Sequence, residues 1–150
     1  MSFTHSVTAD PEVDQEATAL IDALVRTSFV TTAIISKIAA DHDLSLTQLR
    51  VLAILEDRRV KMTDLADYLG LDKSTISGLI DRAQKRGLVE RAPNPLDGRG
   101  VDVFLTKTGA DLAQVGRVVI ASALSPMTGV LHRAESERLT TLLERMLDGR

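Results

Sequence analysis

The chain has 150 residues, of which 44% are hydrophobic, and its formal net charge is −3 at pH 7. That length can bury the core of one domain. Cysteine is absent, which excludes a disulfide framework, a thiolate metal site and a thiol redox switch in this sequence. Residues 1–16 lack the basic start and apolar core of a signal peptide, and no run approaches the ~18 apolar residues of a spanning helix. We therefore expect a single soluble domain, a cytoplasmic location and no membrane partner.

The N-terminal third predicts a loose tail followed by one long helix. Residues 1–9 have no periodicity. Asp10 can cap free backbone N–H groups, and Pro11 suits the first helical position. Apolar residues then recur at spacings of three, four and seven as far as the Asp41-His42-Asp43 segment, which we expect to end the helix. The apolar face is wider than one stripe, so it should contact more than one neighbour.

Two shorter helices should follow. Ser45 begins the first. The apolar residues that we expect to point inward from it are Leu46, Leu49, Leu52, Ala53 and Leu55. Thr63 is a capping residue and should begin the second, which ends near Leu69.

The next segment has the spacing of a helix-turn-helix. Ala66 supplies a small residue where two helices touch, Gly70 permits the turn, and Ile76 is a branched apolar residue in the following helix. That helix covers about residues 72–86, and Gly87 should stop it. An ordinary helical hairpin has the same spacing, so the interpretation depends on the exposed side chains.

The expected outer face of helix 72–86 is small, hydroxyl-rich and basic. Such a face can enter the major groove of double-stranded DNA, where hydroxyls reach base edges and cations reach phosphates. The candidate DNA-binding residues on it are Lys73, Ser74, Thr75, Ser77, Arg82 and Lys85. Residues 73–107 carry seven basic and four acidic residues, so this segment is net positive within an acidic chain.

A two-stranded ribbon should follow, formed by residues 88–91 and 101–105. The connecting loop is long for a hairpin, and long connections tend to be functional or disordered. Glycines flank Arg99 in this loop, so its guanidinium can project into a narrow minor groove, which attracts arginine. Alternatively, Asp97 could hold Arg99 in a local ion pair and orient the tip. Both interpretations stay open on the sequence.

Two helices should complete the chain. Thr106 should cap the first, and Pro126 should interrupt or kink it because proline cannot donate the next helical hydrogen bond. The last helix is expected at about residues 135–147, with apolar residues at helical spacing.

These segments together resemble the MarR family of bacterial transcriptional regulators. The resemblance is carried by Leu71-Asp72-Lys73-Ser74-Thr75-Ile76-Ser77-Gly78-Leu79-Ile80-Asp81-Arg82, Gly87-Leu88-Val89-Glu90-Arg91, Asp97-Gly98-Arg99 and Leu105-Thr106-Lys107-Thr108-Gly109. Its most specific part is the Asp-x-Arg tip followed at a fixed distance by Leu-Thr-x-x-Gly. The sequence departs from the family at Ala83, where a leucine is common, and at the start of the last helix, where a serine or threonine cap is common.

The resemblance implies a mainly α-helical winged helix-turn-helix protein with a small β-hairpin wing, formed by one domain over residues 1–150. Residues 1–40 and 107–150 would supply helices that interlock in a homodimer, and residues 45–105 the DNA-binding lobe. The implied function is a repressor that binds a near-palindromic operator. The wing contact in the minor groove is carried over to Arg99. The family also implies release by a phenolic or aromatic acid effector, although no effector-binding residue can be named.

Other classes of function are weaker on the sequence. The three histidines are widely separated and no nucleophile or phosphate-loop motif is present, so we expect neither an enzyme nor a cofactor. A metal-responsive regulator would need ligands such as the Asp41-His42-Asp43 segment, which we interpret as a solvated helix end rather than a metal site. A winged-helix module that binds only protein remains the second alternative, because the chain as a whole is acidic.

Overall fold

The computed structural model describes residues 11–149, and the side chains of residues 15–149. Six helices and three strands occur in this range: α1 (Pro11–Asp41), α2 (Leu46–Leu55), β1 (Val60–Lys61), α3 (Met62–Leu69), α4 (Lys73–Lys85), β2 (Val89–Pro93), β3 (Val101–Leu105), α5 (Lys107–Thr128) and α6 (Arg133–Asp148). The expected N-terminal tail and the cap at Asp10 lie outside the described residues. The mainly helical composition with a small antiparallel sheet confirms the predicted fold class.

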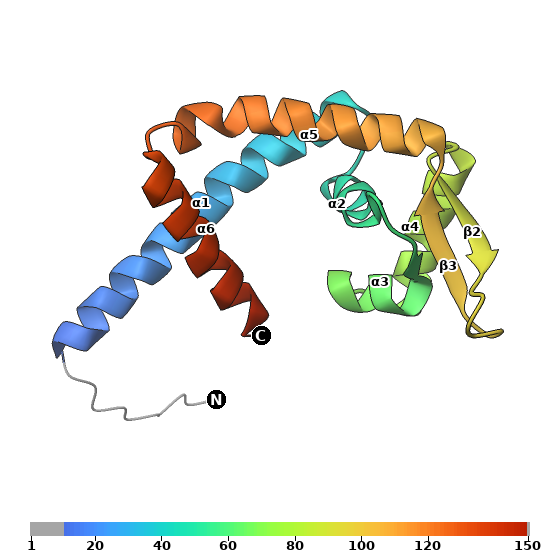
Figure 1. The fold of residues 1–150 in the computed structure, drawn as a ribbon, viewed down its shortest axis with the longest axis horizontal. Coiled ribbons are helices and arrows are strands. Elements are labelled where there is room, and N and C mark those ends of the chain that lie inside the picture. Colours follow the sequence, from blue (N-terminus) through green and yellow to red (C-terminus); the bar gives the residue numbers. More distant parts are fainter. Residues whose placement is uncertain (1–10, 150) are drawn as a thin grey trace, which may run out of the picture.

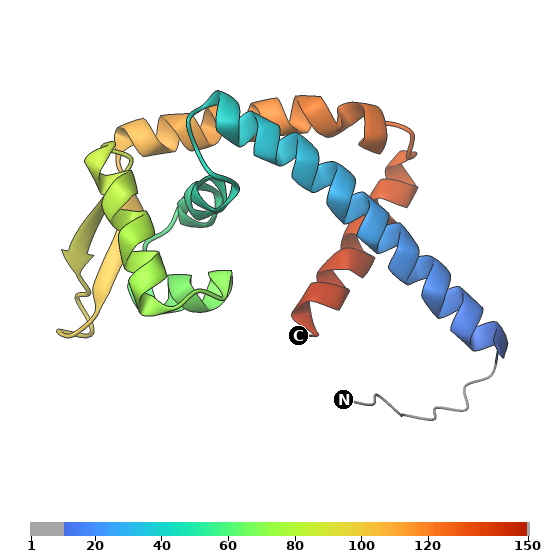
Figure 2. The same cartoon turned by 180° about the vertical axis from the view of Figure 1, so that it is seen from behind.

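The molecule has a winged helix-turn-helix lobe at one end and long helices at the other (Figure 1). In the lobe, α2, α3 and α4 pack with the sheet around one core cluster that also includes Ala39 near the end of α1 and Ala113 in α5. Helix α5 runs from the lobe across to α6, and α1 descends beneath it, as the view from behind also shows (Figure 2). Helix α6 contains no buried residue.

The sheet has three strands in the order β1-β3-β2, all antiparallel, rather than the two expected. The additional strand pairs Val60 with Val103 and Lys61 with Asp102. Two residues are too few to show an alternating pattern, so the sequence gives no signal for this strand. Strand β1 leads directly into α3, which places the first residues of the helix-turn-helix beside the wing.

Most of the predicted helix boundaries are confirmed. Ser45 forms a capping box with Gln48 at the start of α2, and Gly70 and Gly87 adopt left-handed φ values of 65° and 71° after α3 and α4. The prediction that Thr63 caps α3 is wrong. The helix begins one residue earlier, and its N-cap, Lys61, makes no side-chain capping bond because an ammonium group cannot accept a hydrogen bond.

Three further predictions need correction. In α2, Leu46 and Ala53 are exposed, while Val51 and Ile54 are buried together with the expected leucines. Helix α5 is not interrupted at Pro126 but continues to Thr128. The hydroxyl of Ser125 donates to the Ser122 carbonyl at 2.9 Å, the acceptor that the missing proline N–H leaves open. Helix α6 begins at residue 133 instead of 135.

Helix α1 has the length and composition of a membrane-spanning helix from Gln15 to Asp41, with a mean hydropathy of 1.5. Its most apolar stretch is not buried within the chain. Helices α5 and α6 reach the length and apolar composition of a membrane-spanning helix only when they are taken together, and they meet at a bend of 113°. The expectation that no segment approaches the length and apolar composition of a membrane-spanning helix is therefore wrong for α1. One or two such helices are weak evidence for a membrane span, because core helices of other proteins have the same character.

Candidate DNA-binding surface

Helix α4 presents the face that the sequence predicts. Its buried side consists of Ile76, Leu79, Ile80 and Ala83. Five of the six candidate residues on this helix are exposed, namely Lys73, Ser74, Thr75, Arg82 and Lys85. The sixth, Ser77, is half-buried. A hydroxyl-rich first turn and a basic last turn therefore face solvent on one helix.

The N-terminus of α4 is fixed by its cap, Asp72. The carboxylate accepts hydrogen bonds from the Thr75 N–H at 2.7 Å and from the Ser74 hydroxyl at 2.8 Å. These bonds, first the one from the Thr75 backbone, lower the pKa of Asp72 below its ordinary value of 3.8. Ser74 and Thr75 are thus held by an ionised cap at the end of the helix that we expect to enter DNA.

Arg91 on β2 joins the wing to α4, and it is not among the residues predicted from the sequence. Its guanidinium lies 2.7 Å from an Asp81 carboxylate oxygen and donates to the Ser77 carbonyl at 3.2 Å. The Arg91 side chain is only 28% exposed, so water screens this ion pair less than it would screen a surface pair. No spacing rule joins these positions, because the strand and the helix meet only after the chain has turned at Gly87.

The wing loop is ordered by Asn94. Its side-chain carbonyl accepts from the backbone N–H groups of Leu96 and Asp97, both at 2.9 Å, and its amide donates to Asp102 at 2.8 Å. Two backbone bonds, from the Asn94 N–H to the Gly100 carbonyl and from the Gly100 N–H to the Asp97 carbonyl, close the loop at 2.9 Å each. The loop is therefore built from internal hydrogen bonds, an Asx-type turn in which one side chain replaces backbone partners.

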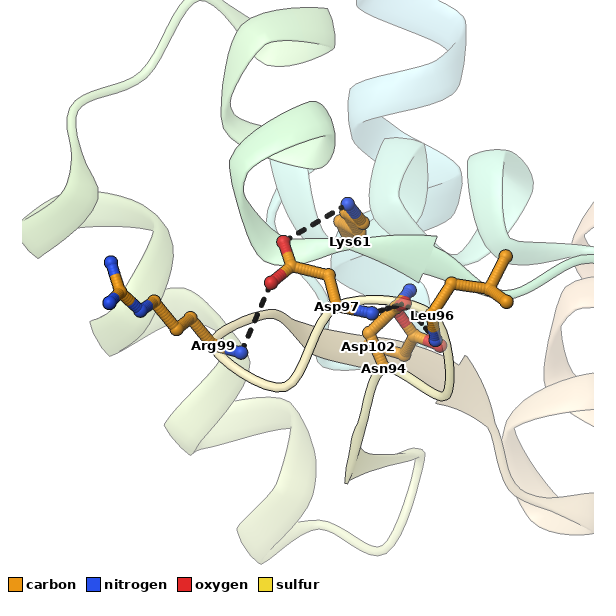
Figure 3. Close-up of polar contacts among 6 residues, drawn as sticks. All are labelled: Lys61, Asn94, Leu96, Asp97, Arg99 and Asp102. Carbon is orange, nitrogen blue, oxygen red and sulfur yellow. Dashed lines mark hydrogen bonds and ion pairs between the residues drawn. The ribbon is translucent and has the colours of Figure 1, made fainter.

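Asp97 holds the wing tip, but through contacts that the sequence did not predict (Figure 3). One carboxylate oxygen accepts from the backbone N–H of Arg99 at 3.1 Å, and the other pairs with the Lys61 ammonium at 3.4 Å. The bond from the Arg99 backbone, followed by the contact with Lys61, lowers the pKa of Asp97. Among the described residues no ion pair involves the Arg99 guanidinium, which points away from Asp97 in Figure 3.

Behind the tip, a buried carboxylate supports the wing. Asp102 is 4% exposed, and its carboxylate accepts a hydrogen bond from the Asn94 amide. The carboxylate also lies 3.4 Å from the Arg59 guanidinium. That guanidinium is 4.6 Å from the centre of the Phe104 ring. Its neighbour Val101 is exposed instead. Asp102 and Val103 are adjacent and both buried, so burial does not alternate along β3, and two polar partners satisfy the buried carboxylate.

The Leu-Thr-x-x-Gly segment joins the sheet to α5. The Thr106 hydroxyl accepts from the Gly109 N–H at 3.0 Å and donates to the Gly87 carbonyl at 2.6 Å, so one side chain caps α5 and anchors the end of α4. A Cβ at Gly109 would lie 1.9 Å from the Leu88 carbonyl oxygen. Glycine is required there because the helix approaches the backbone of the chain before β2.

An open groove of about 390 Å³ separates α4 from the wing. Lys61, Ser77, Arg91 and Arg99 line it together with Asp97. The structure thus brings Ser77 and Arg99 to one groove, adding Lys61 and Arg91, whereas Arg82 and Lys85 lie in the last turn of α4 and do not line it.

No cluster of three potential metal-binding side chains occurs within the described part of the chain. The one imidazole considered as a ligand, His42, is half-buried, and its Nδ1 lies 2.9 Å from the Ile38 carbonyl. That contact occupies one of the two His42 ring nitrogens that could otherwise bind a metal ion.

Comparisons with known proteins agree on one family. The MarR family model matches residues 42–100. The HTH-type transcriptional repressor NicR of Pseudomonas putida is 33% identical over 119 residues, which cover 78% of this chain and 75% of that protein. The multiple antibiotic resistance protein MarR of Escherichia coli is 31% identical over 107 residues, covering 70% and 74%. This chain belongs to the MarR family.

A solved structure of a MarR mutant from E. coli in complex with operator DNA has a similar fold. The TM-score is 0.70 at 25% identity, and the alignment covers 88% of this chain and 96% of that one. The winged helix-turn-helix assigned above is therefore that of a DNA-binding transcriptional regulator of the MarR family.

Both departures from the MarR pattern have a visible consequence. At Ala83 a small apolar cavity of about 10 Å³ lies under the recognition helix, between Leu44, Leu79 and Leu88. At the start of α6, the His132 N–H donates to the Glu135 carboxylate at 2.8 Å, which supports the helix start without a serine or threonine. Neither position belongs to the exposed face of α4.

Proposed function

We propose that this protein is a homodimeric, cytoplasmic transcriptional repressor that binds a near-palindromic operator. The observation that carries the proposal is the hydroxyl-rich, basic face of α4, which stands beside an arginine-tipped wing. The fold shared with a MarR protein whose structure contains operator DNA supports the same assignment. A module that binds only protein would not require a basic helix face and an arginine-tipped wing side by side.

Exposed apolar faces on three helices support the homodimer. They belong to α1, α5 and α6, which supply few or no residues to the core of the lobe. The large apolar side chains exposed on them are Leu20, Ile21, Val25, Phe29, Val30, Val115, Val118, Val119, Met127, Leu139, Leu143, Met146 and Leu147. Apolar surface of this extent marks an interface with protein or membrane. A second copy of the chain covers all three helices at once, and it also accounts for the apolar character of α1.

Each half of the dimer would contact one half-site. The hydroxyls of Ser74, Thr75 and Ser77 would read bases or fix the register in the major groove. Lys73, Arg82 and Lys85 would bind phosphates. Arg99 would enter the adjacent minor groove, since its guanidinium projects from a tip that is already ordered. The two recognition helices would occupy successive major grooves, about 34 Å apart.

The effector would occupy a pocket between α2 and α5. This pocket has a volume of about 320 Å³ and an apolar lining that includes Leu49, Leu52 and Ile120. The ion pair between Glu56 and Arg117 lies at the same pocket, so an aromatic acid could exchange its carboxylate for that of Glu56. Binding would shift the lobe relative to the dimer helices, and release of DNA requires that the ligand prefer that shifted state.

Binding to selected DNA tests the proposal. Duplexes would be enriched from a random pool with the wild-type protein, and affinity would be measured by fluorescence anisotropy from 50 to about 200 mM salt. Arg99→Ala should weaken binding and remove the preference for A·T pairs under the wing. The matched control is Arg133→Ala, an exposed arginine that begins α6. A flat salt dependence for the wild-type protein would contradict DNA binding, and unchanged binding by Arg99→Ala would remove the minor-groove role.

A further inference from the structure

Arg86, at the C-terminal cap of the recognition helix, reaches back to the end of α1. Its guanidinium donates one hydrogen bond to the carbonyl of Asp43 and a second, at 3.2 Å, to the carbonyl of His42. The two partners are 43 and 44 residues away in the sequence. One side chain therefore joins the helix that would read DNA to the turn that follows the helix proposed to dimerise.

The turn between α1 and α2 lies at the C-terminal end of a long helix. Such an end attracts positive charge. The last turn of α1 contains no basic residue. Asp43 turns the chain with a left-handed φ of 55°. Arg86 thus supplies, from α4, donors to two carbonyls of the turn after α1 and a positive charge near a helix end that has no basic residue in its last turn.

Buried apolar side chains also meet at this junction, among them Leu44 from the turn and Leu79 and Ala83 from α4. The elements that lie most closely against α4 are α3 and β2, not α1 or α2. The cavity beneath Ala83 lies between α4 and Leu44, the residue that follows the Arg86-bonded turn. Apolar contacts are not directional, so the two Arg86 hydrogen bonds add an angular constraint between the turn and α4.

We propose that Arg86 is a positioning residue that fixes the direction of α4 relative to α1 and thereby sets the operator half-site spacing that the dimer accepts. The inference rests on the proposed function, because α1 can transmit a spacing only within a dimer. The planar guanidinium is suited to this task, since two donors of one rigid group meet two neighbouring carbonyls. A lysine keeps the charge but has no such fork.

The first experiment measures spacing preference. Palindromic operators with the selected half-site would be made at the native centre-to-centre spacing and at one base pair more and one less. We expect the wild-type protein to favour the native spacing, and Arg86→Ala to lose about tenfold in that preference, the equivalent of one or two hydrogen bonds. Arg86→Lys should behave like Arg86→Ala. Lys85→Ala, the matched control, should lower affinity at all three spacings by the same factor and reduce the salt dependence.

The outcomes separate the possible roles of Arg86. An unchanged spacing preference in Arg86→Ala would overturn the proposal. Full rescue by Arg86→Lys would overturn it as well, because a phosphate contact needs only the charge. A merely stabilising role would lower the unfolding temperature without changing the ratio of affinities between spacings. Absence of binding to any duplex by the wild-type protein would instead contradict the proposed function.

A second measurement needs no DNA. The chain has no cysteine, so Gln84→Cys on the exposed side of α4 would place one spin label on each protomer. Pulsed electron resonance then gives the distance between the two recognition helices. We expect Arg86→Ala and Arg86→Lys each to broaden the distance distribution in the labelled protein. An equally narrow distribution in all three proteins would refute the positioning role, whereas a monomeric wild-type sample would instead contradict the proposed homodimer.

Discussion

Replacing Gly109 by alanine should destabilise the fold, whereas the same change at Gly116 should be tolerated. Both glycines are buried residues of α5. A Cβ at Gly109 would lie 1.9 Å from the carbonyl oxygen of Leu88 and 2.9 Å from its carbonyl carbon. At Gly116 the nearest atom would be a methyl carbon of Leu49 at 3.3 Å. The two sites therefore differ in whether the neighbour is backbone or a side chain that can move.

The expected free energies follow from that difference. Alanine gains about 1 kcal/mol over glycine within a helix, and this gain applies at both sites. At Gly116, Leu49 borders the open α2–α5 pocket and can shift, so most of the gain should survive. At Gly109 the obstructing carbonyl also accepts the Thr106 N–H at 3.1 Å, so relief of the overlap must separate α5 from the sheet. Overpacking of this kind costs about 3 kcal/mol, which leaves a net loss of about 2 kcal/mol.

Urea unfolding followed by circular dichroism would measure both variants. All samples need the same protein concentration, because the stability of a dimer depends on it. The midpoint should fall for Gly109→Ala and stay level or rise for Gly116→Ala. If Gly109→Ala matched the wild-type protein, the close approach of α5 to Leu88 could not be what fixes the Leu-Thr-x-x-Gly segment. Equal losses at both glycines would point to a general intolerance of α5 instead.

Three further changes test other parts of the structure. Asp102→Ala should lower the free energy of unfolding by about 1–3 kcal/mol, because Arg59 and the Asn94 amide lose a buried acceptor. Calorimetry would measure this loss, and an unchanged unfolding temperature would contradict the conclusion that Asp102 stabilises the wing. The lowered pKa of Asp72 means that its cap contributes stability above pH 3.8, lost as the pH falls through the lowered value. Asp72→Ala should therefore destabilise at pH 7 and converge with the wild-type protein in acid, and a difference independent of pH would argue against an ionised cap. Phe29→Asp should yield monomers in light scattering because Phe29 is 74% exposed on α1, and an intact dimer would exclude that face from the interface.

Much of the helix-turn-helix is determined by the local sequence. The cap at Asp72, the apolar residues from Ile76 to Ala83 and the left-handed turns at Gly70 and Gly87 depend on neighbours within one or two turns. Interactions of that range have fixed spacings, so a pattern can predict them. The exposed hydroxyl and basic residues of α4 follow from the same periodicity. Their contact with DNA remains a prediction.

Long-range contacts decided the wing and its attachment. The sequence left open whether Asp97 pairs with Arg99, two residues away, but its ion pair is with Lys61, 36 residues earlier in a strand that the sequence did not reveal. Arg91 reaches Asp81 only because β2 folds back along α4, and Asp102 is buried only because Arg59 and Asn94 meet it. A charged residue has no intrinsic preference among such partners, since the partner is set by which elements the fold brings together.

The sequence by itself determined the family, the order of the helices and of the two wing strands, and the face that α4 presents, because each depends on residues close together in the chain. The tertiary structure alone decided that Asp97 pairs with Lys61 instead of the Arg99 guanidinium and that Arg86 joins α4 to the turn after α1. Both results depend on hydrogen bonds between segments whose separation in the chain carries no periodic signal. Such contacts exist only once the core has fixed the distance between helices.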